Sequence, residues 1–70
     1  MDRVISYKGF EIRALEQGAD RWLAKIRKAN GAWIIVRGER SESVTTSAAR
    51  STANAALDLA IDAIDGGGIK

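Results

Sequence analysis

The chain has 70 residues, of which 11 are Lys or Arg and 9 are Asp or Glu, giving a formal net charge of +2, and it contains neither Cys nor His. A single domain of this size buries only about 60% of the surface that its unfolded chain exposes, so its stability is marginal or shared with a partner. Without Cys and His, the composition excludes a disulfide framework, a thiolate or imidazole metal site, and Ser-His or Cys-His catalysis.

The charge is distributed unevenly along the chain. Residues 1–40 carry nine basic and five acidic side chains, whereas residues 41–70 carry two basic and four acidic ones. Such asymmetry is typical of an anion-binding face, and also of charges spread over a small solvated surface. The first six residues contain no apolar run of signal-peptide length, and no window approaches the ~20 apolar residues of a membrane span. We therefore expect a soluble, cytoplasmic protein that does not associate with a membrane.

Two strands with one buried face are predicted in the first half of the chain. The first runs from Lys8 to about Glu16 and the second from Arg21 to Arg27, because apolar and polar residues alternate there with the period of a half-buried strand. The residues expected to face the core are Phe10, Ile12, Ala14, Trp22, Ala24 and Ile26. Those expected on the opposite face are Glu11, Arg13, Leu15, Leu23, Lys25 and Arg27. Turn-compatible residues at 17–20 return the second strand antiparallel to the first.

A third strand is predicted over residues 32–37, joined to the second by the Asn-Gly pair at 30–31. Asn-Gly is the strongest short hairpin signal, because both residues tolerate the positive φ of a type I′ turn. The strand is apolar on both faces, so alternation alone does not orient it. In the register that turns Ile34 and Val36 toward the core, the outer face gains Trp33, Ile35 and Arg37.

Residues 38–46 are predicted to form a polar loop. A helix then follows from Ala48 to about Ile64, capped by Thr46 or Ser47, because apolar residues recur there with helical spacing. The stripe expected to pack on the sheet is Ala49, Ala53, Ala56, Leu57, Ala60, Ile61 and Ile64. Glycines at 66–68 end the helix, so we expect one β-β-β-α domain over residues 1–65 and a flexible tail over residues 66–70.

Together these elements predict an α+β fold, a three-stranded antiparallel sheet with one C-terminal helix packed on one face and the other face in water. The exposed face combines basic side chains with an aromatic one, which is typical of a nucleic-acid-binding surface. The candidate nucleic-acid-binding residues are Arg13, Lys25, Arg27, Trp33 and Arg37. The same face holds Leu15, Leu23 and Ile35, and exposed apolar clusters are typical of protein–protein contacts or homodimers.

No pattern in the sequence indicates catalysis, a metal or a cofactor. The Ser and Thr hydroxyls at 41–52 have no base to activate them. The acids of the predicted helix, Asp58, Asp62 and Asp65, have no loop that supplies the further oxygen ligands of calcium; they form a solubilising face or an acidic patch for a basic partner. We therefore expect a non-enzymatic binding module with no catalytic residues, metal or cofactor. Its expected partner is nucleic acid or, alternatively, a protein or a second copy of the chain.

Two resemblances add to this interpretation. Tyr7-Lys8-Gly9, the run Arg21–Arg27, the aromatic Trp33 and the Ala-rich helix together resemble the three-stranded-sheet DNA-binding domain of the plant ethylene-response-factor class and its phage integrase relatives. That resemblance spans most of the chain and implies a sheet in the major groove, with DNA-facing positions at Arg13, Lys25, Arg27 and Trp33 and with Lys8 nearby. The β-β-β-α layout is also similar to small uncharacterised bacterial proteins and to the HicB-type antitoxins, which implies a partner-binding module.

Overall fold

A computed structural model of the chain describes residues 3–46 and 48–70. Four antiparallel strands form one sheet in the order β1-β2-β3-β6, and two further strands form a separate hairpin. The elements in chain order are β1 (Arg3–Tyr7), β2 (Phe10–Gly18), β3 (Arg21–Lys28), β4 (Ile34–Val36), β5 (Glu39–Ser41), β6 (Val44–Thr45) and α1 (Ala53–Asp65). The predicted α+β class, with an antiparallel sheet and one C-terminal helix, is confirmed, but the sheet has four strands rather than three.

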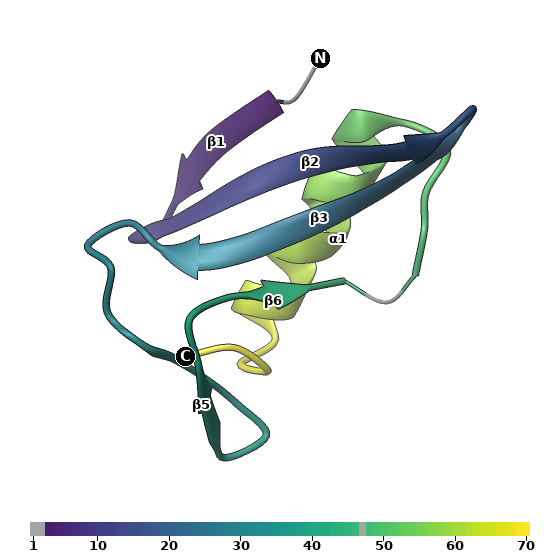
Figure 1. Cartoon of the computed structure of the whole chain (residues 1–70). Coiled ribbons are helices and arrows are strands. Elements are labelled where there is room, and N and C mark those ends of the chain that lie inside the picture. The colour runs from purple at the N-terminus through teal and green to yellow at the C-terminus, as the bar shows by residue number, and fades with distance from the viewer. Residues whose placement is uncertain (1–2, 47) are drawn as a thin grey trace.

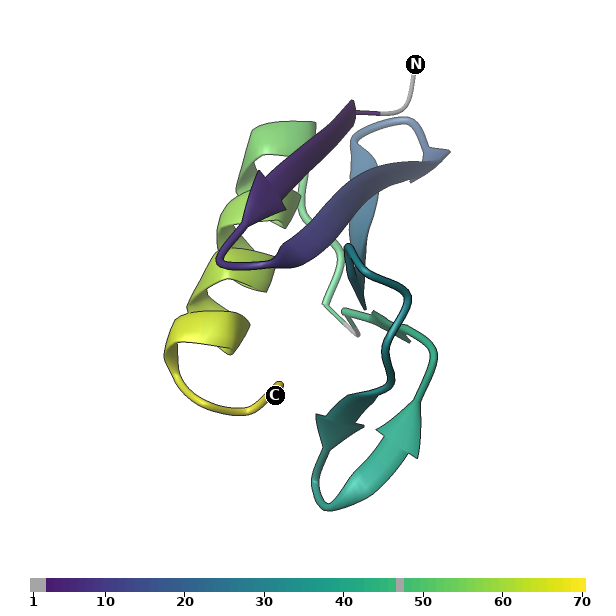
Figure 2. The ribbon, with the colours of Figure 1, turned by 90° about the vertical axis from the view of Figure 1, so that its left-hand side faces the viewer.

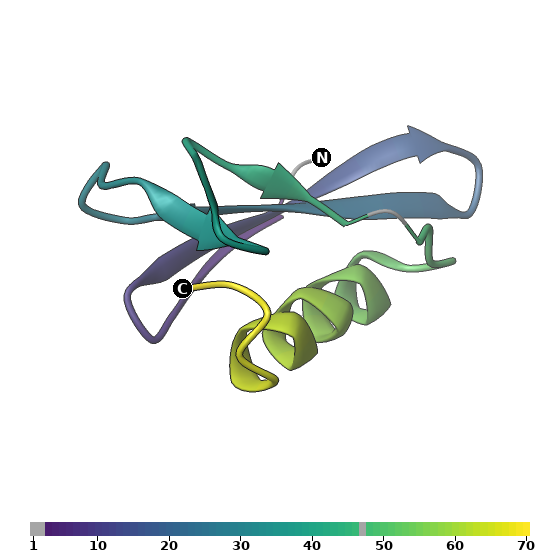
Figure 3. The same ribbon diagram turned by 90° about the horizontal axis from the view of Figure 1, so that it is seen from below.

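The helix α1 covers one face of the sheet and leaves the other face open (Figures 1 and 3). The core between them consists of buried residues from the sheet, the hairpin, the helix and the tail: Phe10, Ile12, Ala14, Ala24, Ile26, Ile34, Ala56, Leu57, Ala60, Ile64 and Ile69. The alternation predicted for the first two strands is therefore confirmed, with Trp22 partly buried against this core. No helix in the described part of the chain has the length and apolar character needed to cross a membrane.

A row of branched apolar side chains crosses the inner face of all four strands. Ile12 lies opposite Ile5 on β1 and opposite Ile26 on β3. Ile26 in turn lies opposite Val44 on β6. Such cross-strand neighbours stabilise a sheet through their packing, so this row explains why β1 and β6, which the sequence analysis did not predict, both belong to the sheet.

The predicted third strand does not join the sheet. Instead, β4 pairs with β5 in a hairpin, and Figure 2 shows this hairpin extending beyond the end of the sheet. Its two-residue turn is Arg37-Gly38, with positive φ angles of 54° and 80°, as a type I′ turn requires. The Asn-Gly pair at 30–31 forms no such turn, because the Gly31 N–H donates to the Lys28 carbonyl at 3.1 Å and the chain leaves the sheet there.

The place beside β3 is taken by β6, which lies in the segment predicted to be a loop. The Thr46 N–H donates to the Ala24 carbonyl at 2.8 Å, and the Thr46 hydroxyl accepts from the Ala24 N–H at 3.0 Å. A little further along, the Trp22 N–H donates to the Arg50 carbonyl at 2.7 Å, and the Trp22 carbonyl accepts from the Arg50 N–H at 2.9 Å. These bonds hold Thr46 and Arg50 beside β3, so Thr46 belongs to the sheet and does not cap a helix.

The helix begins later than predicted, at Ala53, where the Thr52 hydroxyl accepts from the Ala55 N–H at 3.1 Å. Thr52 has extended backbone angles, as a residue that caps a helix N-terminus does. The predicted cap at Ser47 lies outside the described residues. The end of the helix is within one residue of the prediction, and Gly67 adopts a positive φ just after it.

The C-terminal residues depart from the predicted flexible tail over 66–70. Ile69 is buried and forms a bridge with Val36 of the hairpin. The Lys70 N–H donates to the Ile35 carbonyl at 3.0 Å and the Ile35 N–H donates back at 3.3 Å. The Gly-rich turn at 66–68 returns the chain between α1 and the hairpin (Figure 3), where the single apolar side chain of Ile69 fills the core; a single apolar residue shows no pattern in the sequence.

Candidate functional site

The helix-free face of the sheet presents three cross-strand pairs from β2 and β3. In order along the strands they are an apolar pair, a like-charged pair and an oppositely charged pair: Leu15 with Leu23, Arg13 with Lys25, and Glu11 with Arg27. The neighbouring strands add Val4 beside Arg13 and Thr45 beside Lys25. We call this surface the outer face. It brings together three of the five predicted site residues, because side chains alternate along each strand with a period of two.

Glu11 and Arg27 form an ion pair on the outer face. The Nε and Nη2 atoms of Arg27 both lie 2.9 Å from Oε1 of Glu11. The Arg27 side chain remains 57% exposed and that of Glu11 26%. Part of the positive charge of Arg27 is therefore neutralised within the protein.

Arg13 and Lys25 lie directly opposite each other at the centre of the outer face. Side chains in this relation have Cβ atoms about 4.5–5.5 Å apart, so a single anion can contact both. Above the pair lies an open hollow of about 330 Å³, lined by Glu11, Arg13, Leu15, Lys25 and Arg27.

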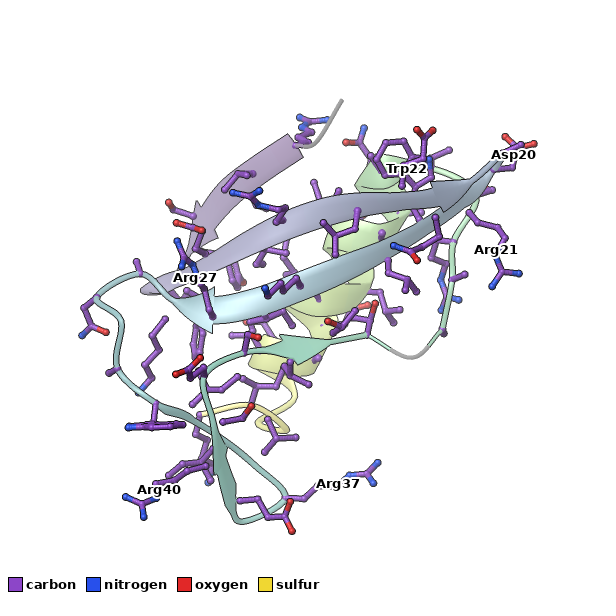
Figure 4. The ribbon with its side chains drawn as sticks, in the orientation of Figure 1. Asp20, Arg21, Trp22, Arg27, Arg37 and Arg40 are labelled. Atoms are coloured by element: carbon purple, nitrogen blue, oxygen red, sulfur yellow. The ribbon has the colours of Figure 1, made fainter. Side chains whose placement is uncertain are left out.

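The other two predicted site residues, Trp33 and Arg37, lie outside the sheet. Trp33 precedes β4 and is 54% exposed, so its indole is accessible to a base or an aromatic ligand. It lines a second open hollow, of about 430 Å³, together with Glu39 and Arg40. Figure 4 shows Arg37 and Arg40 extending from the hairpin in opposite directions.

Arg40 is therefore a candidate that the sequence analysis did not identify. The pair Arg37-Gly38 could have indicated its position, because these residues form a two-residue turn and the residues after it, including Arg40, form the strand that pairs back with β4. That turn was not recognised because a bulky residue at positive φ is uncommon outside Asn and Asp. Of the five predicted residues, the structure thus groups three on the outer face, places Trp33 beside Arg40, and places Arg37 at the tip of the hairpin.

At the end of the helix, two side chains bind Asp65: Tyr7, the last residue of β1, and Lys8, which follows it. The Tyr7 hydroxyl donates to Oδ1 and Oδ2 of Asp65 at 2.9 and 2.8 Å, and the Lys8 Nζ donates to Oδ1 at 2.8 Å. The hydrogen bonds from Lys8 and then Tyr7 lower the pKa of the Asp65 carboxyl. The same carboxylate raises the pKa of the Lys8 ammonium and of the Tyr7 hydroxyl. Asp65 is thus paired within its own chain, and Asp58 and Asp62 are exposed on the same helix.

Within residues 3–46 and 48–70, no group of three or more acidic side chains gathers in a way that would hold a metal ion. The site is therefore described by its cations, one ion pair and one exposed indole. Comparisons of the chain with models of protein families, with curated proteins and with solved structures found no match, so the two resemblances drawn from the sequence stay predictions.

Proposed function

We propose that this chain is a non-enzymatic, cytoplasmic nucleic-acid-binding module that holds phosphate groups on the outer face of its sheet. The observation that carries the proposal is the like-charged pair of Arg13 and Lys25 on the face away from the helix. Basic side chains that share an open face raise the local positive potential and attract an anionic partner. The hollow above the pair supports this, because it is open and carries three cations against one carboxylate.

The outer face favours contacts with phosphates over recognition of bases. Lys and Arg contacts to phosphates supply affinity that does not depend on sequence, and it is the base edges that specify a site. Glu11 limits the net charge of the face to two positive charges from the side chains that line the hollow. The exposed Trp33 adds a surface on which a base of a single strand stacks, with Arg40 beside it.

The alternative, a homodimer formed through the same face, receives less support. Its three apolar residues do not form one patch. Leu15 and Leu23 pair with each other on the sheet and are only partly exposed, whereas Ile35 lies on the separate hairpin. Large interfaces between copies depend on a contiguous apolar core, which this arrangement does not offer.

The test is a salt titration of binding to a mixed-sequence DNA duplex and to single strands of DNA and RNA. Each phosphate that the protein neutralises on a duplex contributes about 0.9 to the log–log slope of affinity against salt concentration. We expect Lys25→Ala to flatten the slope by about one such unit. Lys28→Ala is the matched control, because it removes the same charge from the same strand but from the opposite face, and we expect it to leave the slope unchanged.

Two further variants separate the parts of the site. Trp33→Ala should weaken single-strand binding with little change in slope, because stacking displaces no counterions. Glu11→Gln should strengthen binding and steepen the slope, because it releases Arg27 from its ion pair. If none of the nucleic acids binds at low salt, or if Lys25→Ala and Lys28→Ala have equal effects, the outer face is not a nucleic-acid surface.

A further inference from the structure

β1 is an edge strand of the sheet. It pairs with β2 on one side, and on its other side no strand lies among the described residues. Its sequence, Arg-Val-Ile-Ser-Tyr, is rich in β-branched and aromatic residues and contains no Pro. Such an edge is a template for a further strand, whereas the opposite edge of the sheet is formed by a strand of only two residues.

The turn after β1 identifies which backbone groups face outward. Lys8 and Gly9 both have positive φ, 49° and 83°, and form a two-residue turn between Tyr7 and Phe10. The two residues that flank such a turn exchange both of their backbone hydrogen bonds, and the pattern alternates from there. Tyr7, Ile5 and Arg3 therefore bond to β2, while the N–H and C=O groups of Val4 and Ser6 point to the free edge.

We propose that a second copy of this chain pairs with β1 through its own β1, antiparallel and about a twofold axis at Ile5. In that register, Val4 of each copy exchanges backbone hydrogen bonds with Ser6 of the other. Antiparallel pairing of identical strands is self-complementary, as a twofold interface requires. It joins the two sheets into one, with both helices on the same side and the two outer faces next to each other. This inference does not rest on the proposed function.

Charge complementarity favours a second copy as the occupant. The same register places Arg3 of one copy directly opposite Tyr7 of the other, on the inner face. The Tyr7 hydroxyl donates to Asp65, so the guanidinium of Arg3 approaches both the face of the Tyr7 ring and the Asp65 carboxylate at the end of α1. Arg3 bonds to Asn54 within its own chain, which holds its side chain on the helix side of the sheet. The twofold axis repeats this contact, so each dimer contains it twice.

Sedimentation equilibrium of the full chain over a range of concentrations tests the pairing. We expect a concentration-dependent mass between those of a monomer and a dimer. Ser6→Pro removes an outward N–H without touching the ladder to β2, so it should leave a folded monomer, while Ser6→Ala, which keeps the N–H, should dimerise as the original chain does. A monomeric original chain at its highest soluble concentration, or a dimeric Ser6→Pro variant, overturns the proposal.

A second pair of variants tests the charge contact and does not depend on tolerance of Pro. Arg3→Glu places a carboxylate opposite Asp65 of the other copy, and we expect the dimer to dissociate about tenfold more readily, since each dimer contains the contact twice. Arg21→Glu makes the same change of charge at the exposed start of β3, two strands away from β1 (Figure 4), and should leave the dimer unaffected. Equal dissociation constants for the two variants would exclude the β1 register proposed here.

Discussion

Asp65 occupies a position that the helix dipole disfavours, because it ends α1 and the C-terminal end of a helix repels negative charge. The Lys8 ammonium and the Tyr7 hydroxyl counter this repulsion by direct hydrogen bonds. They come from the end of β1 and the turn after it, so the cluster ties the edge strand to the end of the helix. The contact joins residues 57 and 58 positions apart in the chain.

Asp65→Asn should lower the melting temperature at neutral pH by removing the charge that Lys8 pairs with. Because the pKa of Asp65 is lowered in the folded protein, its stabilising effect is present above the ordinary carboxyl value of 3.8 and is lost as the pH falls through the lower folded value. The pKa values of Tyr7 and Lys8 are raised in the folded protein. Their stabilising effect is therefore present below the ordinary values of 10.0 and 10.5, and it is lost as the pH rises through the higher folded values. The difference in melting temperature between the original chain and Asp65→Asn should thus be constant near neutrality, begin to shrink below about pH 4, and vanish only once the pH is below the lowered folded value.

Asp58→Asn is the control, because it removes the same charge from the same helix at an exposed position. Thermal melts recorded across the pH range would compare the two variants. A difference that is equal for both variants, or that persists in strong acid, would mean that the Asp65 cluster does not stabilise the fold.

At the residue scale, sequence alternation was sufficient to place Arg13, Lys25 and Arg27 on one face, since each strand fixes the direction of its side chains. It also placed Glu11 beside them. It was not sufficient for the Asp65 cluster, because that contact depends on β1 and on the packing of distant elements. Arg40 was missed for a similar reason, since its position follows from a turn whose residues are unusual for that geometry.

At the scale of elements, two adjacent residues of β4 have opposite environments. Ile34 is fully buried, whereas Ile35 is 43% exposed. Ile34 therefore connects the β4–β5 hairpin to the core, which makes the hairpin part of the same cooperative unit as the sheet. Ile69 supports it from the other side through its bridge with Val36.

Ile34→Ala should cost about 2–5 kcal/mol of unfolding free energy, because it leaves a cavity in the core. Ile35→Ala should stay within about 0.5 kcal/mol, because its side chain is already in contact with water. Urea unfolding of the two variants measures both values with the same chemical change at neighbouring positions. An unaffected midpoint for Ile34→Ala would show that the hairpin unfolds independently of the sheet.

The elements that the sequence analysis missed are the short ones. β1 has five residues, β5 has three and β6 has two, too few for a period to be recognised, and all three are stabilised by their partners rather than by propensity. The start of α1 was misplaced because residues 48–50 follow the helical pattern while Arg50 is bonded to Trp22. The long alternating strands and the end of the helix were predicted correctly, because their patterns extend over many residues.

At the scale of the whole molecule, the two sides carry opposite charge. The outer face presents Arg13, Lys25 and Arg27 with one acid among them, and the exposed side of α1 presents Asp58 and Asp62. The molecule measures 33 × 20 × 17 Å, so even its thinnest dimension exceeds the Debye length of about 10 Å at 0.1 M salt. An anion on the outer face is therefore largely screened from the helix acids under ordinary conditions.

Because the basic outer face and the acidic side of α1 are far apart, a change of charge on the helix can show whether binding depends on the outer face or on the net charge of the whole chain. The double variant Asp58→Asn, Asp62→Asn raises the net charge by two units but changes only the helix side. We expect it to bind duplex DNA with an unchanged salt slope, because no further phosphates are neutralised, and with at most a modest gain in affinity at low salt, where screening is weakest. The measurement is the same salt titration used for Lys25→Ala. A slope that steepens by about 0.9 for each Asp removed would show that the overall charge, and not the outer face, governs binding.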